Sequence, residues 1–503
     1  MDSAHYDVVI VGAGISGIGA AYRLQTECPG LSYLIVEGRG SVGGTWDLFK
    51  YPGLRSDSDM FTLGFPFEPW RGEKSIADGA DILQYIKDTT AKYGIDERIR
   101  LNTKVTHASW SSEDASWTID LAGGDGPSQV TAGFCYLASG YYSYDEGYTP
   151  DFPGRESFTG QVVHPQFWPE DLDVTGKRVV VIGSGATAIT LVPALADRGA
   201  EHVTMLQRTP SYILALPGKD PVADLVRRLP SDKVAHSVNR WSNAVKAVGF
   251  YQFARRMPGI ATKALTGGAR RALVDAPAYD PKHFQPPYKP WDQRVCFIPD
   301  GDLFTALRSG DASIVTDTID AFVPEGIRTS SGEVVQADIV VTATGLNLQI
   351  GGGATLDVDG EKVDFGDHFV YRGCMLEGVP NAAMAIGYTN ASWTLRADLS
   401  AQFFCRFVRQ VRDNGYAFGF PRVSGSLTPS PVLDLSSGYV QRSVEELPRR
   451  GDKAPWLVRQ NYVLDALDMK RAKPTDDMRF VRPGESIRPG AGTARRTRDT
   501  ASA

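Results

Sequence analysis

Three observations predict an α/β protein with two Rossmann-like dinucleotide-binding domains and a helical insertion. A short apolar run, a glycine-rich turn and a helical pattern follow one another at the N-terminus, and the same order recurs from residue 178. Basic, amphipathic helical patterns at residues 217–290 interrupt the second unit. With 503 residues, the chain is long enough for two or three domains.

The first glycine turn follows the apolar run Tyr6–Val11, which is typical of a strand buried on both faces. Gly12 allows a tight turn, Gly14 lets backbone approach a pyrophosphate, and Gly17 lets the helix pack closely on the strand. The next apolar run ends at Glu37, about 20 residues further on, where a carboxylate can accept from a ribose hydroxyl. This order predicts a dinucleotide with a free 2′-hydroxyl.

The second glycine turn, Gly183 to Ala188, repeats this order but ends differently. The strand after it delivers Arg208 and Thr209 instead of an acid. A guanidinium binds a 2′-phosphate through charge-assisted hydrogen bonds, whereas a carboxylate would repel it. The second unit is therefore predicted to bind NADPH, although Arg208 could also be a solvated surface arginine. Two different dinucleotides on one chain imply electron transfer between them.

The stretch from Gly43 to Asp57, which follows the first unit, is rich in glycine, proline and aromatic residues. Such a loop suits a flavin, whose flat ring needs close backbone approach and an aromatic neighbour, so the first unit is predicted to bind FAD. Trp46 and Tyr51 could instead pack a core under the loop. Asp57 and Arg55 could form a surface ion pair of little energy.

Composition narrows the class of protein further. The net charge of −6 and the pI near 5.7 give no electrostatic footprint for nucleic acid. The five cysteines are scattered, which favours a reducing compartment without disulfides. Neither a signal peptide nor an apolar run of membrane-spanning length is evident, so we expect a cytoplasmic protein without a transmembrane segment.

The predicted organisation interleaves the two nucleotide units. The A-x-G segments Leu137–Gly140 and Thr342–Gly345 are expected to carry the chain from one unit to the other. The predicted parts are a FAD domain at 1–148 and 346–477, a linker and NADPH domain at 149–216 and 291–345, a helical insertion at 217–290 and a disordered tail at 478–503.

Between the two units, Phe158, Gly160, His164 and Trp168 fit the pattern F-x-G-x-x-x-H-x-x-x-W. This pattern resembles the signature of type I Baeyer–Villiger flavoprotein monooxygenases, and the 43–57 loop resembles a second pattern of that family. Longer stretches, among them YKPWDQR, TATGLNLQ and GYTNASWTL, are similar to its ethionamide-activating branch. We expect His164 to couple the linker to the NADPH domain; it could also be an ordinary, partly buried histidine.

The resemblance implies that Arg294 is the active-site arginine and that Asp57 holds and tunes it. Arginine suits the task because it keeps its charge and offers several donors to a developing anion. A purely structural Arg294 would instead pair with Asp292 or Asp300.

The resemblance also implies a reaction and a set of cofactor contacts. NADPH reduces FAD, a C4a-peroxyflavin forms with O2, and one oxygen atom passes to a hydrophobic ketone, giving an ester or lactone, or to the sulfur of a sulfide or thioamide. The expected FAD contacts are Gly12, Gly14, Ile15, Ser16, Gly17, Glu37, Gly44, Thr45, Trp46, Asp47, Leu48, Arg55, Ser56, Asp57 and Val105. The expected NADPH contacts are Gly183, Ser184, Gly185, Ala186, Thr187, Ala188, Arg208 and Thr209.

Three alternatives share parts of these patterns. A flavin-containing N- or S-monooxygenase has both glycine turns but would normally lack Trp168 and the Arg294 context. A disulfide reductase would need a redox-active cysteine pair, and no two cysteines here are close in sequence. A non-catalytic sensor would bind FAD without oxygen-dependent consumption of NADPH.

The choice between NADPH and NADH is predicted to depend mainly on Arg208. Gln293 stands where related cyclic-ketone enzymes usually carry a lysine that helps to bind the 2′-phosphate. Replacing Arg208 by Ala should therefore raise the KM for NADPH far more than the KM for NADH, as steady-state kinetics with both cofactors would measure. Equal effects on the two constants would contradict this assignment.

Overall fold

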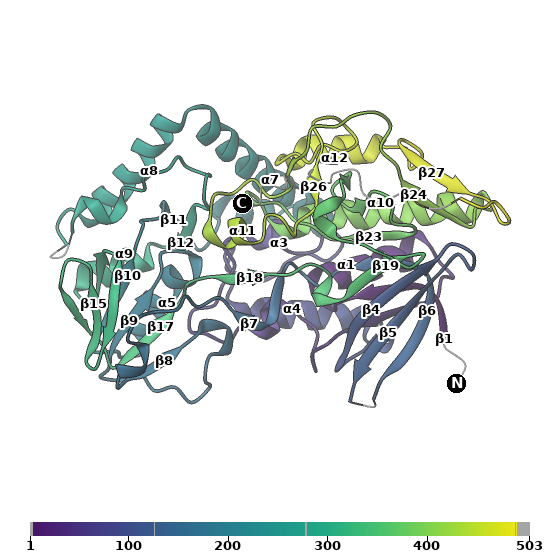
Figure 1. Ribbon diagram of the computed structural model, residues 1–503. Coiled ribbons are helices and arrows are strands. Elements are labelled where there is room, and N and C mark those ends of the chain that lie inside the picture. Colours follow the sequence, from purple (N-terminus) through teal and green to yellow (C-terminus); the bar gives the residue numbers. More distant parts are fainter. Residues whose placement is uncertain (1–3, 125, 277–278, 488, 490–503) are drawn as a thin grey trace.

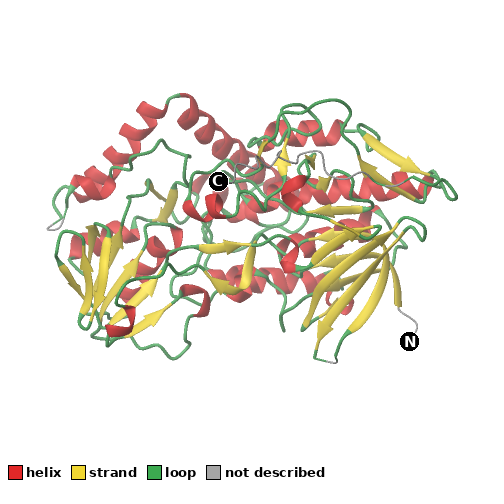
Figure 2. Ribbon diagram, in the orientation of Figure 1, coloured by secondary structure: helices red, strands yellow, loops and turns green. Residues whose placement is uncertain are grey.

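The computed structural model describes residues 4–124, 126–276, 279–487 and 489. Two sheets built around the two glycine turns lie at opposite ends of the molecule, and long helices run along one edge across both (Figure 1). Figure 2 shows that most strands lie in these two end regions, whereas helices, loops and a few short strands fill the space between them.

The first sheet has nine strands in the order β20-β19-β4-β5-β6-β1-β2-β3, with β23 added beside β6. Its parallel part contains the strands β1 (Ala4–Val11), β2 (Tyr33–Val36), β3 (Ile99–Arg100), β6 (Ser128–Leu137) and β23 (Ala382–Met384). The remaining strands extend it as a wing: β4 (Thr103–Ser111), β5 (Ser116–Gly123), β19 (Thr355–Val358) and β20 (Glu361–Lys362). Since β19, β20 and β23 come from beyond residue 345, the chain returns to its first sheet after completing the second.

The helices α1 (Ile15–Glu27) and α10 (Trp393–Asp413) pack together beside this sheet. The last four residues of β1 are buried, as expected for an apolar strand that is covered on both faces. Across the helix pair, Arg23 forms a bidentate ion pair with Asp398, with Nε 2.8 Å from Oδ1. This contact fastens the C-terminal half of the chain to the first glycine unit.

The second sheet is entirely parallel, in the order β13-β10-β9-β17-β8. Its strands are β8 (Gln161–Val163), β9 (Arg178–Ile182), β10 (His202–Gln207), β13 (Ala312–Thr316) and β17 (Ile339–Thr342). The helices α5 (Ala186–Asp197) and α9 (Asp302–Ser309) pack on it. A small antiparallel sheet follows β13, made of β14 (Ile319–Val323), β15 (Gly326–Thr329) and β16 (Val334–Gln336).

The two sheets are joined by an antiparallel ribbon of β7 (Tyr142–Gly147) and β18 (Leu346–Leu348). In Figure 1 this ribbon lies between the two ends of the molecule. It directly follows the two A-x-G segments at which the sequence predicts the crossings. We call β7 and β18 the hinge ribbon.

The described residues of the interval 217–290 contain the α-helices α6 (Pro221–Val226), α7 (Asp232–Arg256) and α8 (Pro258–Leu273). The interval lies between the paired strands β11 (Ile213–Leu216) and β12 (Cys296–Pro299). The α7 helix packs on α3 (Met60–Leu63). Its buried Arg240 donates to the carbonyl oxygens of Phe61, Thr62 and Gly64, at 3.1, 3.1 and 2.7 Å. These bonds satisfy carbonyls that the end of a short helix leaves without partners.

The other elements are short, apart from α4. They are α2 (Thr45–Leu48), α4 (Gly79–Lys92), α11 (Gly438–Arg442), α12 (Tyr462–Arg471), β21 (Val370–Tyr371), β22 (Met375–Leu376), β24 (Phe418–Pro421), β25 (Ser430–Pro431), β26 (Arg449–Arg450) and β27 (Met478–Val481). Across the parts of the chain that the structure describes, no helix has the length and apolar character needed to cross a membrane.

The prediction that residues 478–503 are disordered is wrong for residues 478–487. Here β27 pairs antiparallel with β24, and Val481 is fully buried. The ring of Phe480 lies 4.9 Å from that of Tyr416. The polar composition of the tail as a whole hid one short apolar strand at its beginning. Residues 488 and 490–503 lie outside the described residues.

A charge at position 481 should therefore destabilise the fold. Replacing Val481 by Asp buries a carboxylate without a partner and should lower the free energy of unfolding by about 3 kcal/mol or more. Denaturant unfolding followed by circular dichroism would measure this. The matched control is Pro483→Asp, which places the same charge on an exposed residue two positions on; equal behaviour of the two variants would show that β27 is not part of the folded core.

Candidate functional site

The first glycine turn leaves no room for side chains at two of its positions. Gly12 has a φ of +105°, and a Cβ atom there would lie 2.7 Å from the carbonyl oxygen of Ala138. At Gly17 a Cβ atom would lie 1.9 Å from the carbonyl oxygen of Gly12. A Cβ at Gly14 would face the Cα of Gly44 at 3.6 Å. The backbone at Gly14 and the backbone at Gly44 thus face each other without side chains between them. Main-chain groups of both segments can therefore approach a bound cofactor.

Glu37 lies at the end of β2, with only 5% of its surface exposed. Its carboxylate accepts hydrogen bonds from the backbone N–H groups of Ala13, at 2.7 Å, and Arg39, at 2.9 Å. Burial raises the pKa of Glu37, and the two N–H donors oppose that shift. The carboxylate therefore holds the glycine turn in place. Val105 is buried on strand β4.

A cavity of about 720 Å³ opens beside this turn and is lined by both nucleotide units and the insertion. It brings together these residues that the sequence singled out: Gly14, Ile15, Ser16, Gly44, Thr45, Trp46, Ser56, Asp57 and Arg294. Asp47, Leu48 and Val105 are not among its lining residues. Asp47 instead pairs with Arg39 at 2.8 Å. None of the five cysteines lines it, and all five are buried and unpaired, which argues against disulfide reduction.

Arg294 and Asp57 meet at this cavity, although they come from different parts of the chain. Arg294 Nη1 lies 3.7 Å from Asp57 Oδ2. The structural alternatives for Arg294 do not hold, because Asp292 pairs with Arg255 at 2.5 Å and Asp300 accepts from the backbone N–H of Gly218 at 2.9 Å. The guanidinium of Arg294 therefore faces the cavity with a single carboxylate beside it.

The surroundings of Arg294 keep it charged. Burial disfavours the charge, but Tyr439, Tyr141 and Asp57 outweigh burial and raise the pKa of Arg294 above its usual value. Within the described part of the chain, Arg294 Nε and Trp291 Nε1 are buried without a hydrogen-bond partner. Buried donors without a partner are uncommon in folded proteins, so the polar groups beside the cavity are not fully satisfied by the protein itself.

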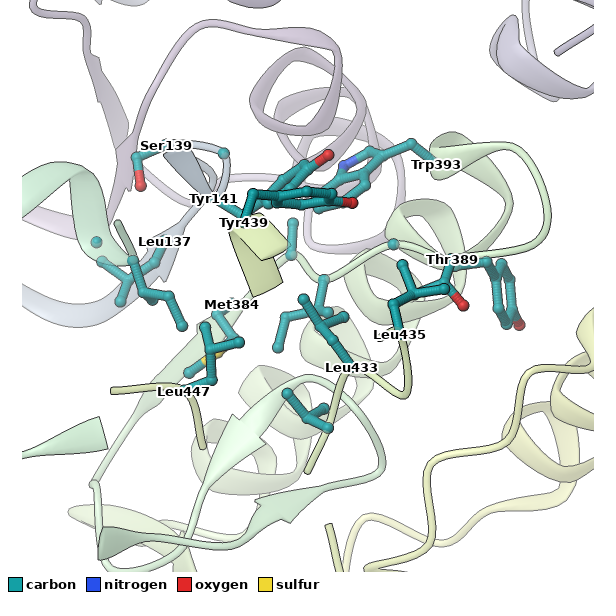
Figure 3. A pocket seen from close by; sticks show the side chains of 18 of the residues that line it. Leu137, Ser139, Tyr141, Met384, Thr389, Trp393, Leu433, Leu435, Tyr439 and Leu447 are labelled. Atoms are coloured by element: carbon teal, nitrogen blue, oxygen red, sulfur yellow. The ribbon is translucent and has the colours of Figure 1, made fainter. Parts of the chain in front are cut away.

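Aromatic rings lie beside Arg294, among them those of Tyr141 and Tyr439. The rings of Tyr141 and Trp393 are stacked, with centroids 5.0 Å apart, and Tyr439 lies with them in Figure 3. Trp393 Nε1 also donates to Ser16 Oγ of the glycine turn at 2.8 Å. Beneath these rings is a small apolar pocket that Arg294 also lines, with Leu137, Met384, Leu433, Leu435 and Leu447 among its walls (Figure 3).

The short helix α11 connects this region to the hinge ribbon. Its Tyr439 lies beside Arg294, and its Arg442 guanidinium stacks on the ring of Tyr148, with Cζ 3.3 Å from the ring centroid. Arg442 also donates to the carbonyl oxygen of Leu346 in β18 at 3.3 Å. No sequence signal pointed to α11, because its contacts with Arg294, Tyr148 and Leu346 are with residues far away in the chain.

The loop from Gly43 to Asp57 docks the first unit onto the second. At Gly53 (φ +74°) a Cβ atom would lie 2.8 Å from Ala194 Cβ of α5. Arg55 forms an ion pair with Asp302 at the start of α9, so the Asp57–Arg55 pair considered from the sequence is not formed. Burial raises the pKa of Tyr51 in this loop to about 12, while a hydrogen bond to Thr187 opposes the shift. Arg55 thus joins the two units and does not line the cavity.

The second glycine turn lies outside the central cavity. Gly183 has a φ of +135°, and a Cβ atom there would lie 2.4 Å from the carbonyl oxygen of Ala343. A Cβ at Gly185 would meet open space at the start of α5, while Ser184 Oγ donates to the carbonyl oxygen of Thr209 at 2.7 Å. Arg208 is exposed and, among the residues described, has no ion-pair partner. This geometry fits a phosphate at the helix N-terminus and a second beside Arg208.

The residues of the F-x-G-x-x-x-H-x-x-x-W pattern lie away from the cavity. Phe158 and Trp168 are buried in the cores of the second unit, and a Cβ at Gly160 would lie 2.3 Å from the carbonyl oxygen of Asp338. The ring of His164 packs so closely on Gly147 of the hinge ribbon that a Cβ there would lie 2.0 Å from His164 Cε1. Burial lowers the pKa of His164. His164 thus contacts the hinge ribbon, whereas Phe158, Gly160 and Trp168 pack within the second unit.

Two glycine turns at the ends of two sheets, with a charged arginine between the units, define the class of protein as a two-dinucleotide oxidoreductase. Residues 9–214 match the pyridine nucleotide-disulphide oxidoreductase family. Over 481 residues the chain is 50% identical to the FAD-containing monooxygenase EthA of Mycobacterium tuberculosis, which covers 95% of this chain and 98% of that protein.

Solved structures share the fold. An oxidised steroid monooxygenase bound to NADP has a TM-score of 0.74 at 21% identity, over 95% of this chain and all of that chain. A polycyclic ketone monooxygenase from Thermothelomyces thermophila has a TM-score of 0.72 at 19% identity, over 96% of this chain and 90% of that one.

The chain belongs to the FAD-containing monooxygenases. It is an FAD- and NADPH-dependent enzyme of mixed α/β fold. The family resemblance, the fold class and both cofactors predicted from the sequence are therefore confirmed.

The packing of His164 predicts a pH dependence of stability. The unfolded chain takes up a proton on this histidine near pH 6.5, whereas the folded chain, with its lowered pKa, does so only at lower pH. The stability that the neutral ring contributes is complete above about pH 6.5 and is lost as the pH falls toward the folded-state value.

The variant His164→Asn should remove this component. Its thermal midpoint should fall less than that of the parent between about pH 8 and about pH 5.5, a range that spans the usual histidine pKa. The exposed His5 provides the control variant, His5→Asn, which should behave like the parent. Parallel curves for the parent and His164→Asn would contradict the interpretation.

Proposed function

We propose that this enzyme inserts one oxygen atom from O2 into hydrophobic ketones to give esters or lactones, and that it also oxidises sulfides or thioamides at sulfur. The observation that carries this proposal is the placement of Arg294, permanently charged and beside Asp57, on the wall of a cavity that also reaches the first glycine turn. The alternative is a flavin-containing N- or S-monooxygenase without Baeyer–Villiger activity.

The cofactors would be held largely by backbone. Gly14, Ile15 and Ser16 at the start of α1, together with the segment from Gly44 to Trp46, would hold FAD. The second glycine turn and Arg208 would hold NADPH. When bound, FAD reduced by NADPH supplies the activated oxygen.

Arg294 would stabilise the negative charge that develops on oxygen during transfer. Its guanidinium cannot lose a proton under working conditions and is already oriented toward the cavity, so no reorganisation is needed when charge develops. Asp57 would act as a positioning residue, because its single contact of 3.7 Å orients the guanidinium without engaging all of its donors.

The apolar and aromatic lining would exclude water from the reacting centre. Tyr141, Trp393 and Tyr439 cover Arg294 on one side, and Leu433 and Leu435 continue the apolar wall. Such a lining strengthens the electrostatic effect of the arginine and favours a hydrophobic substrate. A ketone suits this combination because its carbonyl oxygen can accept from the guanidinium while its carbon groups contact the apolar wall. We also expect a cytoplasmic location, as the five unpaired, buried cysteines favour a reducing compartment.

The test is oxygen consumption by the FAD-loaded enzyme with NADPH and a panel of ketones and sulfides, followed by product analysis. Esters or lactones should form from ketones. The variant Arg294→Lys should lose at least about 100-fold in ester formation, since lysine is a point charge with a different donor geometry. NADPH oxidation should persist in this variant and release hydrogen peroxide.

The matched control is Arg255→Lys, because Arg255 pairs with the neighbouring Asp292 and does not line the cavity. Oxidation of sulfides alone, with no ester from any ketone, would favour the alternative. The absence of any oxygen-dependent NADPH consumption would exclude both.

A further inference from the structure

Exposed apolar side chains are concentrated in one part of the described chain. Eleven exposed large hydrophobic residues lie between residues 222 and 274, and two more lie on α12, each between 40% and 64% exposed. Elsewhere in the described chain only Leu101 and Phe167 are comparable. The residues of this surface, which we call the insertion face, are Val222, Leu225, Leu229, Val234, Val238, Trp241, Val245, Phe253, Met257, Ile260, Val274, Leu464 and Leu467.

The insertion face has a regular centre on α7. Val234, Val238, Trp241 and Val245 follow one another at spacings of four, three and four residues, which places them on one side of the helix. The ring of Trp241 lies 5.3 Å from that of Tyr462, so α12 continues the surface beside α7. Figure 1 shows α7, α8 and α12 along one edge of the molecule. Apolar side chains gathered in this way mark an interaction surface.

The charge of the same segment is opposite to that of the chain. Residues 221–275 contain ten lysines and arginines but only three aspartates, a net charge of +7 in a protein whose total is −6. Arg240 is buried against α3. The following six have no ion-pair partner within the described ranges: Arg228, Lys233, Arg256, Lys263, Arg270 and Arg271. A surface that combines exposed apolar groups with unpaired cations is complementary to an anionic, apolar partner.

We propose that the insertion face docks the enzyme on the surface of an anionic lipid bilayer. Valine, leucine, tryptophan and phenylalanine would enter the boundary between headgroups and acyl chains, and the cations would contact lipid phosphates. A second copy of the chain is disfavoured, because pairing two faces of +7 would bring like charges together. This inference does not depend on the proposed reaction.

The position of α7 connects docking with the cavity. Asn243, Lys246, Ala247 and Phe250 line the central cavity, whereas Val238, Trp241 and Val245 are exposed on the insertion face. The same helix therefore forms a cavity wall and the centre of the docking surface. A docked enzyme would hold its cavity beside the bilayer surface, which is where apolar solutes partition.

The experiment is co-sedimentation of the full-length, FAD-loaded enzyme with vesicles of phosphatidylcholine, with and without phosphatidylglycerol. The enzyme should sediment with the anionic vesicles only, and binding should weaken as salt is added. Brominated lipids in the anionic vesicles should quench tryptophan fluorescence, and less so in Trp241→Phe. Equal sedimentation with both kinds of vesicle, or with neither, would overturn the proposal.

Two pairs of variants separate insertion from general surface effects. Both V238E/V245E and K233E/R256E should lower partitioning onto anionic vesicles by about tenfold or more, since each basic residue near such a surface contributes appreciably. The controls are Leu101→Glu and Lys87→Glu, exposed residues outside the insertion face; both should bind as the parent does. FAD content and thermal midpoint verify folding, and the charge-reversal pair tests the idea even if the valine pair does not fold.

The competing hypothesis is that the insertion face binds a second copy of this chain, and the oligomeric state tests it. Sedimentation equilibrium without vesicles should give the same mass for the parent and V238E/V245E. A parent dimer that V238E/V245E dissociates would assign the insertion face to a second copy of this chain and overturn the lipid proposal.

Discussion

The arrangement of the whole molecule depends on how the 43–57 loop of one nucleotide unit contacts the helices of the other. Gly53 brings the loop backbone against α5, because any side chain there would collide with Ala194. Arg55 then pairs with Asp302 of α9. These contacts set the distance between the two glycine turns and leave Asp57, two residues further on, at the cavity next to Arg294. This docking therefore helps to hold Asp57 beside Arg294 at the boundary between the units.

Local sequence patterns predicted the parts of the fold that local chemistry determines. The glycine turns could be predicted because only glycine suits certain backbone positions. In the structure, a Cβ atom at Gly12, Gly17 or Gly183 would collide with a carbonyl oxygen. The return of the chain to its first sheet followed from the two crossing segments. The tail was mispredicted because β27 is stabilised by β24, some 57 residues earlier, and not by its own composition. A four-residue strand carries too little pattern to stand out from polar surroundings.

The residues of the candidate site that lie in a sequence motif could be predicted. Those that only the packing of the folded chain brings to the site were missed. Arg294 and Asp57 came from the family resemblance, and the cavity brings them together. Trp393 lies in the GYTNASWTL stretch that carries the resemblance, but neither it nor Tyr141 and Tyr439 was assigned a role, since aromatic residues are usual in any core. The helical insertion was recognised as basic and amphipathic, but its contribution to the cavity wall follows only from the packing of α7.

The helix α11 has a mechanical consequence. It is only five residues long, so it has no interior in which to bend, and it touches the hinge ribbon through Arg442 and the guanidinium of Arg294 through Tyr439. Any rotation of one nucleotide unit against the other moves both ends of this rigid lever together. A change in the relative orientation of the two units would therefore also change the surroundings of Arg294.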